Sequence, residues 1–139
     1  MKEILTALML WLSANTPFQA HPELPKVVFL PIETMEQMFY GDNEYEPDQL
    51  HGMYNKDIDT IYLPDDWNRN SAWDMGVLVH EMVHYLQDQN EMKFNCSNEM
   101  EKMAWPIQQF YLKKVHDYDW DYDQLWFLVI SNCNEPYNF

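Results

Sequence analysis

Two histidines and a glutamate stand together in residues 77–86 (VLVHEMVHYL), a stretch whose other side chains are uncharged. His80 and His84 are four residues apart, so on a helix both side chains project from one face, about one turn apart. Imidazole nitrogen is a common ligand of zinc, which usually takes four ligands in a tetrahedral arrangement. The spacing therefore predicts that His80 and His84 bind the same metal ion.

Glu81 directly follows His80 and points about 100° around the helix from it. It would lie beside a metal ion held by the histidines, where a carboxylate can take a proton from an activated water. We therefore interpret Glu81 as a general base. The alternative is a purely structural helix without metal, with the histidines in core hydrogen bonds and Glu81 on the surface. The uncharged surroundings favour the metal site, because unpaired polar groups are costly on a buried helix.

The same stretch resembles the active-site helix of the zincin metallopeptidases, in which uncharged residues flank His-Glu-x-x-His. The metzincin subgroup would need a glycine and a third histidine where this chain has Gln87 and Asn90. The gluzincin subgroup instead takes its third ligand from a glutamate on a following helix. Here the candidates for that ligand are Glu99 and Glu101.

Glu101 is the better match for the third ligand. Gluzincins often carry a small residue three positions after the ligand glutamate, and Ala104 stands there, whereas the same position after Glu99 is a lysine. The resemblance thus implies one zinc ion per chain, bound by the two histidines and Glu101. Two alternatives remain open, namely Glu99 as the ligand, or Glu101 paired with Asn98 in a capping box at the helix start.

Over residues 11–112 the wider pattern resembles small, single-domain, gluzincin-like bacterial proteins of unknown function. This resemblance implies a zinc-dependent hydrolase and no particular substrate. Gln87 and Gln108 match recurrent positions of the pattern, where they would hydrogen-bond the ligands. They could equally be ordinary surface glutamines.

In zincins the strand before the active-site helix often lies at the edge of the sheet and binds substrate as an added strand. Thr60, Ile61 and Tyr62 occupy that place here. The resemblance therefore implies that their backbone pairs with an extended peptide. An ordinary hairpin strand is the alternative. His116 and several tyrosines are candidates for stabilising an oxyanion, and the sequence selects none of them.

The order of the expected elements predicts an α+β fold in one domain, residues 1–139. Helices are expected at residues 4–12, 32–41, 71–89, 98–116 and 121–130, a strand at 26–30, and a hairpin at 52–63. The small, antiparallel-containing sheet would pack on the histidine helix and the glutamate helix. The aspartates of residues 117–123 (DYDWDYD) alternate as in a calcium loop, but the required glycine and glutamate are missing, so a solvated loop is expected.

The net charge of the chain indicates which classes of binding partner are not expected. With 8 basic and 23 acidic residues its net charge is −15, so neither nucleic acid nor an anionic membrane is an expected partner.

The apolar run at residues 4–14 is too short to span a bilayer and is interpreted as the first helix rather than a signal peptide. Cys96 and Cys133 could be free thiols or a disulfide. A cytoplasmic location is the default, and a disulfide would imply export.

These observations lead to one main hypothesis and two alternatives. The main hypothesis is a zinc-dependent peptide-bond hydrolase that acts on a peptide or protein, with a metal-activated water and Glu81 as general base. The first alternative is a zincin-like module or effector that binds zinc without cleaving peptides, since a short chain has little room for a walled cleft. The second alternative is the structural helix without metal.

Overall fold

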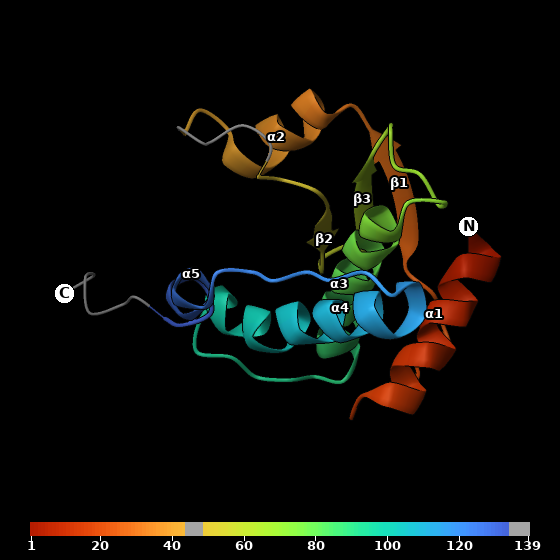
Figure 1. The fold of residues 1–139 in the computed structure, drawn as a ribbon. Coiled ribbons are helices and arrows are strands. Elements are labelled where there is room, and N and C mark those ends of the chain that lie inside the picture. The colour runs from red at the N-terminus through yellow and green to blue at the C-terminus, as the bar shows by residue number, and fades with distance from the viewer. Residues whose placement is uncertain (44–48, 134–139) are drawn as a thin grey trace.

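The computed structural model describes residues 1–43 and 49–133 (Figure 1). In chain order its elements are α1 (Lys2–Asn15), β1 (Lys26–Leu30), α2 (Ile32–Tyr40), β2 (Met53–Asn55), β3 (Thr60–Pro64), α3 (Ala72–Gln89), the 3-10 helix η1 (Ser97–Met100), α4 (Glu101–His116) and α5 (Gln124–Ile130). The predicted α+β class is confirmed. Compared with the expected elements, α1 is longer at both ends, and residues 97–100 form η1 instead of the first turn of α4.

The three strands form one sheet in the order β1-β3-β2, in which β3 pairs with β1 in parallel and with β2 in antiparallel orientation. The predicted edge position of Thr60, Ile61 and Tyr62 is therefore wrong. All three lie on the central strand, and the side that the hairpin leaves open is occupied by β1. Because their backbone groups are paired on both sides, these residues cannot bind a peptide as an added strand.

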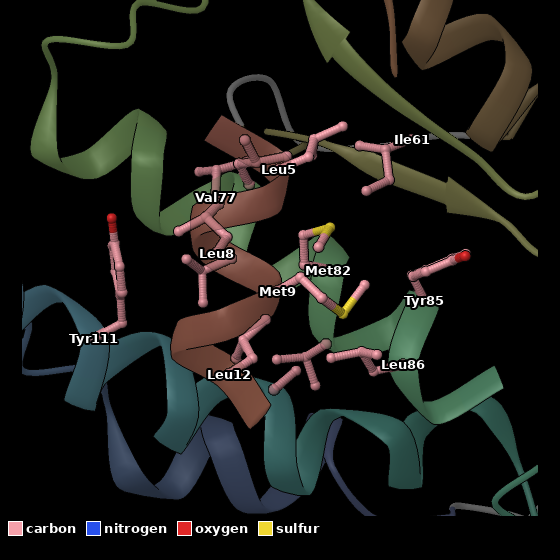
Figure 2. Close-up of a cluster of buried hydrophobic side chains, with 14 of the residues drawn as sticks. Leu5, Leu8, Met9, Leu12, Ile61, Val77, Met82, Tyr85, Leu86 and Tyr111 are labelled. Carbon is pink, nitrogen blue, oxygen red and sulfur yellow. The ribbon is translucent and has the colours of Figure 1, made fainter. Parts of the chain in front are cut away.

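Helix α3 begins at a local signal and carries much of the core. The Ser71 side chain caps it by accepting a hydrogen bond from the Asp74 backbone N–H at 3.2 Å. Apolar side chains of α1, spaced as on one helix face, pack with those of α3, β3 and α4 (Figure 2). The fully buried members of this core include Leu12, Ile61, Leu63, Leu78, Val79, Met82, Val83, Leu86 and Leu112.

Helix α4 packs directly on α3, which brings the two predicted halves of the metal site together. Gly76 on α3 allows the contact: a methyl group there would lie 2.8 Å from Leu112 Cδ2. Ala104 is fully buried as well. Small residues at such positions let two helices approach closely, and here this approach places the start of α4 beside the second half of α3.

A disulfide joins Cys96, in the loop before η1, to Cys133, which follows α5. Beside it, Asn98 Nδ2 donates a hydrogen bond to the Asn132 carbonyl oxygen at 3.0 Å. The cross-link thus ties the end of α5 to the segment that leads into α4. Within residues 1–43 and 49–133, no helix has the length and apolar character needed to cross a membrane.

Candidate metal centre

The structure brings the side chains of His80, His84 and Glu101 to one point between α3 and α4. His80 Nε2 lies 3.0 Å from Glu101 Oε2, and His84 Nε2 lies 3.1 Å from Glu101 Oε1. The two histidine Nε2 atoms are 3.1 Å apart. These three side chains therefore form a compact group with one nitrogen or oxygen atom each available to a common ion.

Two glutamines determine which histidine nitrogens face this point. Gln87 Nε2 donates to the Met100 carbonyl oxygen at 2.9 Å, which turns its Oε1 toward His84 Nδ1 at 2.8 Å. Gln108 Oε1 lies 2.8 Å from His80 Nδ1. Because an amide oxygen can only accept, each Nδ1 carries the proton, and a neutral ring then presents an unprotonated Nε2. The predicted contacts of both glutamines with the histidines are confirmed.

This arrangement fits a zinc ion. Two unprotonated nitrogens and a carboxylate converge, so only acceptors face one another unless a cation or a proton lies between them. Tetrahedral bonds of about 2.0–2.1 Å place neighbouring ligand atoms about 3.3 Å apart, close to the separations given above. His80, His84 and Glu101 would supply three ligands, and the side chains are partly open to solvent, as a fourth ligand position requires.

The alternatives for Glu101 and Glu99 are decided by where their side chains lie. Helix α4 has no side-chain cap, and the Asn98 side chain contacts Asn132 instead of the helix start, so the capping box does not form. Glu99 accepts a hydrogen bond from the Asn95 backbone N–H at 2.7 Å and pairs with Lys102 at 3.6 Å. Of the two glutamates, Glu101 is the one that meets both histidines.

Glu81 lies beside this group and is buried, with 6 % of its surface exposed. Burial raises its pKa above the ordinary value, although the charges of His80 and His84 oppose the shift. Gly52, just before β2, lies directly against it: a methyl group at Gly52 would be 3.3 Å from Glu81 Oε2. Glu81 thus lies next to the candidate metal ligands, against the backbone that leads into β2. Sequence reasoning did not identify Gly52, and only the pairing of distant segments reveals it.

His116 lies elsewhere. Its Nε2 contacts the Tyr111 hydroxyl at 3.0 Å near the end of α4, whereas Glu101 begins that helix. Fifteen helical residues span about 22 Å, so His116 is too far from the group to stabilise an oxyanion there.

Without metal, the group is expected to hold a proton. Burial lowers the pKa of His80, but the hydrogen bond to Glu101 and the charges of Glu81 and Glu101 raise it to about 9. Burial also raises the pKa of Glu101, but hydrogen bonds from both histidines bring it well below its usual range. The metal-free site therefore resembles an imidazolium–carboxylate pair, and a metal ion would replace the proton.

Metal-free protein is expected to lose stability as the pH rises from about 6.5 to above 9. A group whose pKa is higher in the folded than in the unfolded protein stabilises the fold. The full contribution is present at pH values below the unfolded-state pKa, and it is lost as the pH rises through the folded-state pKa. For His80 the change from 6.5 to about 9 corresponds to on the order of 3 kcal/mol. The raised pKa of Glu81 acts in the same direction. Urea midpoints of chelator-treated protein between pH 6.5 and 9.5 measure the effect.

The control for this pH series is Glu101→Gln, which removes the carboxylate that raises the His80 pKa. Its midpoints should change less with pH than those of the unsubstituted protein. Equal slopes in the two proteins would show that the pair with Glu101 does not hold the proton.

Replacing Gln87 by leucine is expected to weaken zinc binding about 10- to 100-fold, because His84 loses the partner that orients its ring. Gln87 is fully buried, so the fold must be checked by circular dichroism. The matched control is Gln89→Leu on the same helix, whose side chain contacts Asp59 and no histidine. Competition with a chromophoric chelator gives both affinities, and equal losses in both variants would contradict the orienting role.

Comparison with known proteins adds the family of the chain. No curated protein and no solved structure matches it. A family model described as a domain of unknown function, DUF6647, matches residues 1–136. Since this match covers nearly the whole sequence, the chain belongs to the DUF6647 family.

Proposed function

We propose that this protein is a zinc-dependent peptide-bond hydrolase of gluzincin type. The observation that carries the proposal is the convergence of two histidine Nε2 atoms and the Glu101 carboxylate, with the buried Glu81 beside them. Zinc bound there would supply a Lewis acid that polarises the substrate carbonyl and makes water more acidic. Glu81 would take a proton from the attacking water and deliver it to the leaving nitrogen.

The surroundings of Glu81 support this role. A general base works best when its pKa lies near the working pH, and burial moves the pKa of Glu81 upward from its ordinary value. The histidines and Gln87 and Gln108 provide the remaining requirement, which is a rigid set of ligands. Within the described residues, the Glu81 side chain forms no hydrogen bond or ion pair with Glu101, Gln87 or Gln108, so its carboxylate stays available for proton transfer.

The sheet order suggests where a peptide would lie. Strand β2 is at the edge of the sheet, antiparallel to β3, and Gly52 just before it touches Glu81. An extended peptide paired with the outer edge of β2 would run past the general base and the metal ligands. We therefore propose β2, in place of β3, as the strand that aligns the substrate.

The experiment combines zinc content with turnover. Protein purified without chelator should contain about one zinc per chain by elemental analysis and should cleave an unstructured protein such as casein in a chelator-sensitive way. Zinc without cleavage would favour the alternative of a zinc-binding module. Protein that takes up no zinc would overturn both the hydrolase and the zinc-binding module. The measurement must be made without reductant, because Cys96, Glu99 and Cys133 could form a second metal-binding group when the disulfide is broken.

The disulfide also bears on the compartment. Cys96 and Cys133 are bonded, and disulfides persist in oxidising surroundings such as the periplasm or the extracellular space. We propose that the protein acts there. Alkylation of free thiols in protein taken from its natural source, followed by mass spectrometry, would show whether the pair is oxidised.

A further inference from the structure

A group of aromatic side chains, here called the aromatic wall, is formed by α3, α4, α5 and the segment between α4 and α5. It consists of Trp73, Trp105, Trp120, Tyr122 and Phe127. Trp120 is its centre, with ring centroids 5.2 Å from Trp73, 5.2 Å from Trp105 and 4.9 Å from Tyr122. All five side chains are only half-buried. Such a set of large rings, neither in the core nor fully exposed, offers aromatic faces to a bound molecule.

The wall shares two helices with the candidate ligands. Trp73 precedes His80 by seven residues on α3, which is two turns along nearly the same face, and Trp105 follows Glu101 by four residues on α4. Trp73 also contacts His51, the residue before Gly52, with ring centroids 5.6 Å apart. The wall therefore lies along the ligand-bearing faces of α3 and α4 and contacts the residue before Gly52, which lies against Glu81.

The segment that carries Trp120 is held in place against α4. Residues 117–123 run back along α4 toward α5, the blue trace in Figure 1. Gln109 on α4 donates a hydrogen bond from Nε2 to the Trp120 carbonyl oxygen at 2.8 Å. At the end of the segment, Asp123 caps α5 by accepting from the backbone N–H groups of Leu125 and Trp126. The predicted loop is confirmed. It is not only solvated, because the hydrogen bonds to Gln109 and at the start of α5 hold its aromatic side chains in place.

The same segment is acidic. Its aspartates alternate with the aromatic residues, and it contains no basic residue. In the described part of the chain, Lys113 is the one cation that pairs with Asp117 and Asp119, at 3.0 and 2.9 Å, so one positive charge meets two negative ones. Asp121 is exposed between Trp120 and Tyr122. Together with the net charge of −15, this makes the surroundings of the wall attractive to cations.

We propose that the aromatic wall binds a lysine or arginine side chain of the substrate, so that the protein selects basic peptides. A cationic side chain is attracted by the face of a tryptophan and by neighbouring carboxylates at the same time. An apolar side chain would gain only the contact with the rings, and an acidic one would be repelled by the aspartates. This inference rests on the proposed function, since it names the class of peptide that the hydrolase would take.

Binding is tested on zinc-loaded Glu81→Gln protein, which is not expected to consume the ligand. The probes are extended peptides that differ only in one central residue, arginine, glutamine, leucine or glutamate, and their affinities are measured by isothermal titration calorimetry. We expect the arginine peptide to bind about tenfold more tightly than the glutamine and leucine peptides. Trp120→Leu should remove this preference while keeping an apolar side chain in place. The matched control Trp126→Leu, outside the wall, should keep the preference.

A charge control separates the wall from the general attraction of an acidic protein. Asp121→Asn should weaken binding of the arginine peptide several-fold, whereas Asp57→Asn, in the exposed turn between β2 and β3, should leave it unchanged. Equal affinities for the arginine and leucine peptides would overturn the proposal. Equal losses in the two aspartate variants would also overturn it, because the attraction would then be general.

Turnover distinguishes this inference from the proposed function. The unsubstituted protein is incubated with an equimolar mixture of the same peptides, and the products are identified by mass spectrometry. Preferential cleavage of the arginine peptide supports both the hydrolase function and the selection of basic peptides. Cleavage of all peptides at equal rates overturns the selection of basic peptides and leaves the hydrolase standing. Selective binding without any cleavage keeps the basic-peptide site and removes the hydrolase.

Discussion

Glu81→Gln is expected to retain zinc and to lower kcat for peptide hydrolysis by about 10²- to 10⁴-fold, the usual contribution of a general base. Glutamine keeps nearly the shape of the glutamate against Gly52 but cannot accept the proton. The substitution also removes a buried carboxylate, so the fold should be no less stable. Elemental analysis and steady-state kinetics on a fluorogenic peptide measure the two effects on one preparation.

His84→Ala provides the contrasting case, because it removes a ligand and should lose zinc and hydrolysis together. If Glu81→Gln released the metal as well, Glu81 would be a ligand and the division of roles would be wrong. If it kept full activity, another group would have to be the base.

Glu101→Ala is expected to weaken zinc binding by several kcal/mol, about 10²- to 10⁴-fold, since one of three protein ligands is lost. The variant also leaves His80 and His84 without the carboxylate that faces both of them. Glu99→Ala is the matched control two residues away, and it should cost only the local contacts with Asn95 and Lys102. Competition titration with a chromophoric chelator gives the affinities of all three proteins.

A normal zinc affinity in Glu101→Ala would remove Glu101 from the site and with it the gluzincin assignment. A comparable loss in Glu99→Ala would point instead to a general weakening of the segment that leads into α4. Thermal denaturation of the metal-free variants distinguishes that case, because general weakening would lower the stability of both.

The parts of the site that could be predicted from sequence are those that depend on one helix or on a short spacing. His80, Glu81 and His84 share a helix, so their relative positions follow from its geometry. Glu101 required the resemblance to gluzincins, because spacing alone left Glu99 and a capping role open. In the structure Glu101 contacts both histidines, whereas Asn98 and Glu99 contact other residues.

The parts that could not be predicted depend on pairing between distant segments. The hairpin was visible in the sequence, but the parallel pairing of β1 with β3 joins residues that are 34 positions apart and leaves no local signal. That pairing places β3 in the centre of the sheet and leaves β1 and β2 at its edges. The approach of Gly52 to Glu81 and the gathering of Trp73, Trp105 and Trp120 have the same origin.

If the protein is a peptidase, the Cys96–Cys133 disulfide would hold the chain together after self-cleavage. The cross-link closes a covalent ring, and the acidic aromatic segment at residues 117–123 lies inside it. A cut in that exposed segment would leave a nicked chain whose two pieces stay joined, with α4 still packed on α3. His80 and His84 lie outside the ring, on a helix whose interior is buried and therefore poorly accessible to cleavage. Self-digestion within residues 117–123 would thus leave His80, His84 and Glu101 in one covalently connected molecule.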